Sequence, residues 1–197
     1  MAYIENLHAP DISDLGPSLV ARTARAMISR GGTSMESSNA FRLITGFLIT
    51  TDKAIREYCA GRTTLLDYCS NSKGLDQLQD GLGRFETCIL TAKRALRFLE
   101  KLSAHPDSPK LERTLRRLSG KFGETLIPIR NTIEHMDEEI GKETQLTPGM
   151  AHLLSIDRSG EYLDISEHKI SLMDLAKILR HLHHVGRELL SNLPPKI

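Results

Sequence analysis

The sequence predicts a mainly α fold, an up-and-down bundle of about five helices with a β-hairpin before the last helix. Apolar residues recur at every third or fourth position over long stretches, as they do on helices that bury one face. Clusters of Gly, Pro, Ser and Asn interrupt these stretches. Between residues 153 and 165, two short apolar runs flank a turn sequence that contains glycine, which is typical of a β-hairpin.

The predicted helices follow one another along the chain, separated by these turn clusters. Ser13 and Asp14 can cap a first helix that extends to about residue 30, where two glycines end it. The other helices are expected over residues 35–69, 75–102, 111–141 and 171–193. Residues 1–34 are predicted to form an N-terminal helical arm, and residues 35–197 to form one helical bundle.

The predicted fourth helix carries the strongest local pattern in the chain, Arg130 and Asn131 followed after three more residues by His135. Its apolar stripe continues for about eight turns and comprises Leu111, Leu115, Leu118, Phe122, Leu126, Ile129, Ile133, Met136 and Ile140. Because each helical residue advances about 100°, Asn131 and His135 should point away from this stripe, and Arg130 should lie on its flank. Pro128 should kink the helix without breaking its pattern.

Arg130, Asn131 and His135 resemble the catalytic motif of the HEPN superfamily, all-helical domains found in bacterial and archaeal toxins, anti-phage effectors and CRISPR-associated ribonucleases. That motif is an arginine, then a polar residue, then a histidine after four to six intervening residues in all. This chain matches its order, its spacing and its polar residue. The resemblance implies a metal-independent endoribonuclease without a cofactor, acting as a toxin or defence effector. It also implies a homodimer, with an antitoxin protein as a further partner.

The residue types fit this chemistry. A histidine can remove the proton of a ribose 2′-hydroxyl or supply one to the leaving oxygen. An arginine can hold the phosphate that is cut and stabilise its extra charge, while an asparagine can orient the arginine or the substrate. A 2′-hydroxyl nucleophile needs no metal and restricts cleavage to RNA. The alternative is a non-catalytic helical interaction module, in which these residues belong to a solvated helix face.

Basic residues gather upstream of the motif, where nine lie between positions 91 and 121 against three acidic residues. They form either an ordinary charged surface or a track for the RNA backbone. The residues predicted to bind RNA are Arg94, Arg97, Arg113, Arg116 and Arg117. The net charge of the whole chain is +1, so it provides no general attraction to nucleic acid. The acidic group at positions 134 and 137–139 is a solvated face, a modulator of His135 or a source of repulsion for RNA.

Other features bear on further classes of function. No apolar run approaches the roughly 20 residues of a membrane span, and the N-terminus lacks the features of a signal peptide. The three scattered cysteines predict reduced thiols in a cytoplasmic protein. His181, His183 and His184 share the last predicted helix, where a packing or surface role is favoured over a metal site, so no metal ligand is assigned. Arg180 and His184 repeat the motif with one residue too few between them.

Overall fold

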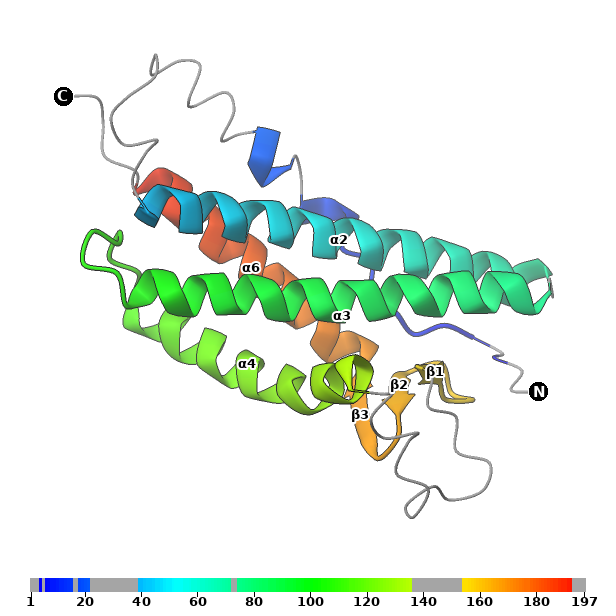
Figure 1. Ribbon diagram of the computed structural model, residues 1–197. Helices are drawn as coiled ribbons and strands as arrows, with labels where there is room; N and C mark the ends of the chain where they lie inside the picture. Colours follow the sequence, from blue (N-terminus) through cyan, green and yellow to red (C-terminus); the bar gives the residue numbers. More distant parts are fainter. Residues whose placement is uncertain are drawn as a thin grey trace.

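The structure, a computed structural model, describes residues 4, 6–15, 18–21, 39–71, 74–135 and 154–192. Over these residues the chain is mainly helical, with a small three-stranded antiparallel sheet before the last helix, which confirms the predicted fold class (Figure 1). Within the same ranges, no helix combines the length and the apolar character that a membrane crossing requires.

Two long antiparallel helices form the centre of the bundle. α2 spans Asn39–Asn71 and α3 spans Leu75–Ser103, and the two lie side by side (Figure 1). α4, Arg113–Glu134, packs against α3, while α6, Leu172–Ser191, lies behind α2 and α3. Leu, Ile and a few aromatic side chains fill the space between these helices as one continuous core.

Two glycines allow α2 and α3 to approach closely. A Cβ atom added at Gly61 would lie 3.0 Å from the Gly81 carbonyl oxygen, and one added at Gly81 would lie 2.5 Å from a methyl carbon of Leu65. A larger residue at Gly81 would therefore displace Leu65 from the core. Close to this contact, the rings of Tyr58 and Phe85 meet edge to face with their centroids 5.4 Å apart.

The predicted fourth helix does not continue regularly through the motif histidine. α4 begins at Arg113 and ends at Glu134, and His135 caps it by donating its N–H to the Asn131 carbonyl at 2.9 Å. The φ of −111° and ψ of 21° at His135 depart from helical values. Residues 136–141, where the helix was expected to end, lie outside the described part of the chain.

The apolar stripe of α4 is buried over only part of its length. Ile129 and Ile133 lie in the core as predicted, and Phe122 is half-buried. Leu118, in contrast, is 39% exposed, so its predicted place in the core is wrong. The next residue, Ser119, is buried instead, and its hydroxyl lies 2.8 Å from Nε2 of a histidine of α6.

The small sheet contains the predicted hairpin. β1, Ser155–Ile156, pairs with β2, Tyr162–Ile165, and the turn between them contains Gly160 at a φ of +70°. β2 also pairs with a third strand, β3, His168–Ser171, which the sequence does not predict. β3 has a single large apolar residue, and its turn contains Ser166 at a φ of 52° in place of glycine. The two usual sequence signals of a hairpin strand, alternating apolar residues and a turn glycine, are therefore both missing here.

The described N-terminal residues pack onto the bundle, where Ile4, Ile12 and Leu19 are buried. The predicted first helix is interrupted, because η1, Ser13–Leu15, is a short 3-10 turn and helical structure begins again at Leu19. Asp11, rather than Ser13, caps this turn by accepting the Ser13 N–H at 2.8 Å. Residues 22–38 lie outside the described part of the chain, so the domain boundary after residue 34 stays a prediction.

Two charged side chains of the bundle hold this N-terminal segment. Arg180 of α6 donates to both carboxylate oxygens of Asp14, at 2.6 and 2.7 Å, and to the Asp11 carbonyl at 2.9 Å. Asp52 of α2 accepts the backbone N–H groups of Leu19 at 3.0 Å and Val20 at 2.9 Å, as a helix cap does. Arg180 therefore has a structural role at this contact.

A buried histidine joins α6 to α4. His181 is 7% exposed, its ring meets the Phe122 ring edge on, and its Nε2 lies 2.8 Å from the Ser119 hydroxyl. That hydroxyl also lies 2.8 Å from the Leu115 carbonyl and can donate its proton there, which leaves its oxygen able to accept from Nε2. Burial lowers the pKa of His181 to about 4, and the nearby His184 acts in the same direction. His181 thus has the packing role that the sequence favours.

We expect His181 to make the fold sensitive to acid. The pKa of histidine is about 6.5 in an unfolded chain and about 4 here, so between these values only the unfolded state binds the proton. The free energy of unfolding should therefore fall as the pH drops through this interval, by up to about 3 kcal/mol. Denaturant titrations at pH 7 and pH 4.5 measure this loss, and His181→Gln should reduce it. An equal loss in both proteins would contradict the assignment.

Candidate functional site

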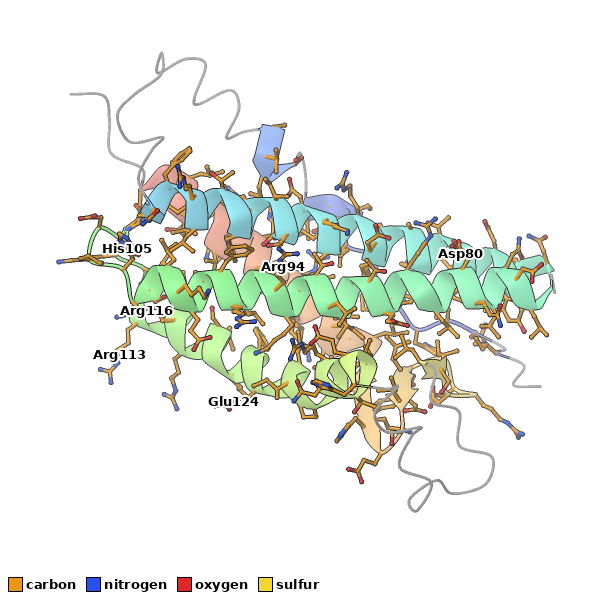
Figure 2. The ribbon with its side chains drawn as sticks, viewed as in Figure 1. Asp80, Arg94, His105, Arg113, Arg116 and Glu124 are labelled. Carbon is orange, nitrogen blue, oxygen red and sulfur yellow. The ribbon has the colours of Figure 1, made fainter. Side chains whose placement is uncertain are left out.

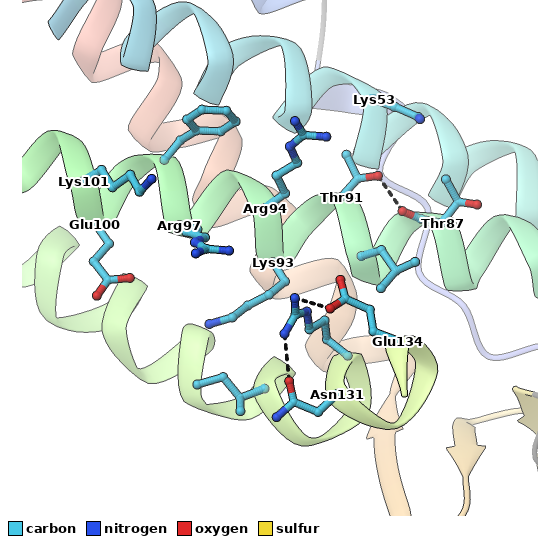
Figure 3. A pocket seen from close by; sticks show the side chains of 14 residues that line it. Lys53, Thr87, Thr91, Lys93, Arg94, Arg97, Glu100, Lys101, Asn131 and Glu134 are labelled. Atoms are coloured by element: carbon cyan, nitrogen blue, oxygen red, sulfur yellow. Dashed lines mark hydrogen bonds and ion pairs between the residues drawn. The ribbon is translucent and has the colours of Figure 1, made fainter. Parts of the chain in front are cut away.

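An open groove of about 960 Å³ lies along α3, between α2 and α4 (Figure 3). Two acidic residues, Glu100 and Glu134, are among its lining side chains. Six others are basic, and they define what is called here the basic groove: Lys53, Lys93, Arg94, Arg97, Lys101 and Arg130. The excess of cations over carboxylates makes this groove a candidate site for an anionic ligand.

The spacing of residues on α3 explains how these cations come together. Lys93, Arg97 and Lys101 recur at every fourth position, so they share one side of the helix, with Arg94 beside them. The opposite side of α3 consists of small and apolar residues that are buried in the core: Ala92, Ala95, Leu96 and Leu99. α2 adds Lys53, and α4 adds Arg130 and Asn131 from the other side (Figure 3).

Most of these cations form no ion pair within the ranges that the structure describes. Arg130 forms an ion pair with Glu134, but none of the other five forms an ion pair with a carboxylate among the described residues. Arg94 instead lies over the ring of Phe98, 5.9 Å from its centroid. Like charges held together without counter-ions repel one another, so an anion bound in the basic groove would stabilise it.

Lys93 stands at the junction of α3 and α4. Its ammonium group is half-buried and donates to the Gly123 carbonyl of α4 at 3.2 Å. Burial lowers the pKa of Lys93, while Glu100 opposes this effect and the charges of Arg130 and Arg97 add to it. Lys93, Arg97 and Arg130 are therefore close enough to influence one another and could contact the same anion.

Arg130 and Asn131 of the motif both line the basic groove. Arg130 Nη1 donates to Asn131 Oδ1 at 3.0 Å, which is the contact that an orienting asparagine would make. Arg130 Nη2 contacts the carboxylate of Glu134, so the guanidinium lies between two oxygen acceptors of its own helix (Figure 3). Sequence reasoning left the role of Glu134 open, although the spacing of four residues from Arg130 favours this ion pair.

His135 and three of the predicted RNA-binding arginines lie elsewhere. His135 is exposed at the end of α4 and does not line the basic groove. Arg94 and Arg97 do line it, whereas the arginines at the N-terminal end of α4 are exposed outside it: Arg113 and Arg116, which Figure 2 labels, and Arg117. A single chain therefore assembles Arg130, Asn131, Arg94 and Arg97 but leaves His135 apart from them.

The chain matches no protein-family model, no curated protein and no solved structure. Across the described ranges, no group of three or more His, Cys, Asp or Glu side chains is placed to hold a metal ion. The basic groove and the motif beside it are therefore the features of this chain that bear on its function.

The basic groove predicts which arginines matter for binding a polyanion. Arg97→Gln should weaken binding of a single-stranded RNA whose 2′-oxygens are methylated, and lower the dependence of log K on log salt by about 0.7. Arg116→Gln removes the same charge outside the groove and should leave this slope nearly unchanged. Fluorescence anisotropy at several salt concentrations measures both variants. A larger effect of Arg116→Gln would move the binding surface to the start of α4.

Proposed function

We propose that this chain is a metal-independent endoribonuclease of the HEPN type, in which the basic groove holds the RNA backbone. The observation that supports this best is the position of Arg130 and Asn131 in a groove whose five other cations form no ion pair with any carboxylate that the structure describes. Binding of linked phosphates would relieve their mutual repulsion and bring one phosphate to Arg130. The resemblance further suggests a toxin or defence effector that an antitoxin neutralises.

The proposed reaction is an internal transfer at phosphorus. The ribose 2′-oxygen attacks the adjacent phosphate and loses its proton to a base, and the 5′-oxygen of the next nucleotide leaves with a proton from an acid. The products are a 2′,3′-cyclic phosphate and a free 5′-hydroxyl. Arg130 would stabilise the charge that develops on the phosphate oxygens, and His135 would serve as the acid or base.

Because His135 does not line the basic groove of its own chain, we propose that a second chain supplies it to this chemistry. Asn131 and His135 are one helical turn apart and both exposed, and Ile127 on the same stretch of α4 is 41% exposed. A symmetric dimer formed through this face would bring His135 of one protomer to Arg130 of its partner. We therefore propose a homodimer with two composite sites.

The position of His135 also favours the second candidate, a non-catalytic helical interaction module. Within one chain the histidine lies outside the basic groove, and Arg130 is already paired with Glu134. In that case the fold and the groove would bind a partner without cutting it. Cleavage assays distinguish the two functions.

We expect the purified protein to cut single-stranded RNA in the presence of EDTA and to leave a 2′,3′-cyclic phosphate. His135→Ala should lower the rate about 10²–10⁴-fold, because it removes the acid–base group. Arg130→Ala should be comparably severe, and Arg130→Lys should restore only part of the rate, since lysine lacks the planar fork. His184→Ala, a change at an exposed histidine away from the groove, should leave the rate unchanged. Cleavage that survives His135→Ala but is lost with EDTA would contradict the proposed site.

The composite site has its own test, in which two inactive variants are combined. Arg130→Ala and His135→Ala chains, coexpressed in equal amounts, should form mixed dimers that hold one intact site each. About a quarter of the wild-type activity should return, since half of the dimers are mixed and each has one of two sites. No recovery, despite mixed dimers detected by mass spectrometry, would place both residues in one chain or remove the catalytic role.

A further inference from the structure

The guanidinium of Arg130 is already bound by its own helix. Nη1 donates to the orienting Asn131 Oδ1, and Nη2 faces the Glu134 carboxylate, an anion at a position that a phosphate oxygen could take (Figure 3). We propose that Glu134 holds the place of a phosphate on Arg130, as an internal competitor that the RNA backbone must displace. This inference rests on the proposed function, because it concerns the same groove.

The ion pair between Glu134 and Arg130 is of a kind that another anion can displace. Arg130 and Glu134 are four residues apart on α4, and their side chains are 30% and 39% exposed. Exposed ion pairs at this spacing are weak, because water screens them and two long side chains must be held in one geometry. Glu134 can turn into solvent without leaving a buried charge behind, so an anion with additional contacts can replace it.

The rest of the basic groove decides which anions have such contacts. A single phosphate would gain Arg130 and the neighbouring Lys93 but would have to displace Glu134 by itself. A chain of linked phosphates can first bind the other five cations, which form no ion pair within the described part of the chain, and it then presents its next phosphate to Arg130 at high local concentration. Glu134 therefore favours engagement of Arg130 by linked phosphodiesters over engagement by free phosphate at the same concentration.

The same competition would distinguish the two stages of cleavage. A phosphodiester carries one negative charge in the bound substrate and gains a second as the 2′-oxygen attacks. The attraction of Arg130 for the phosphate rises accordingly, so the transition state displaces Glu134 more completely than the substrate does. In binding experiments with uncut RNA, Glu134 should then mask part of the contribution of Arg130.

The test compares two glutamates of α4 that differ in position alone. Glu124 is exposed and lies outside the basic groove, so Glu124→Gln and Glu134→Gln change the net charge equally (Figure 2). With a 2′-O-methyl RNA oligonucleotide, which cannot be cut, Glu134→Gln should tighten binding about 2–5-fold. Glu124→Gln should stay near wild type. Arg130→Ala should weaken binding by a larger factor in the Glu134→Gln background than in the wild type.

Two results would overturn the inference. In one, Glu124→Gln and Glu134→Gln tighten RNA binding equally; in the other, Glu134→Gln tightens binding even when Arg130 is replaced by alanine. Either result would mean that the tighter binding comes from the change in net charge. If the variants behave as expected but unmodified RNA is not cut, the ribonuclease proposal fails and the role of Glu134 stands. If the oligonucleotide binds neither the wild type nor any variant, both fail. Thermal unfolding of each variant verifies that the compared proteins are folded.

Discussion

The fold depends on how α3 is enclosed. It packs against α2, α4 and α6, so its apolar and small residues must face these helices and leave one strip of its surface to solvent. A lysine or arginine on such a helix cannot be buried without a partner, because an unpaired charge in the core is very costly. The basic residues between positions 93 and 101 are therefore confined to this strip. The density of charge in the basic groove thus follows from packing as much as from composition.

The sequence predicts the helices of this bundle well because their apolar stripes are long. The sequence predicts the structure less well where the pattern extends over only a few residues. β3 has one large apolar residue and a turn without glycine, so it has no period that could be recognised. Leu118 fits the stripe of α4 by spacing, but the buried position in that turn belongs to Ser119, whose hydroxyl contacts His181. A spacing rule counts apolar residues and cannot register a buried hydrogen bond from another helix.

The residues of the candidate site also differ in how well the sequence predicts them. Arg130 and Asn131 are neighbours in sequence, so a local motif suffices to identify them. Lys53 joins them from α2, and only the packing of α2 against α3 shows that it belongs to the same groove. The Glu134 contact follows from a spacing of four residues, but the sequence leaves several roles for this acidic residue open. His135 shows the limit of a motif, since its spacing fits while its position at the helix end keeps it out of the groove.

The contact between Arg180 and Asp14 has a consequence for how the protein is made. These residues are separated by 166 positions, yet the arginine ties the first described turn of the chain to its last helix. A ribosome delivers α2, α3 and α4 before α6, so the apolar faces that α6 covers stay open until α6 has been made. The N-terminal segment cannot find its partner before then. Emergence of α6, rather than of any earlier helix, is therefore the event that closes the core.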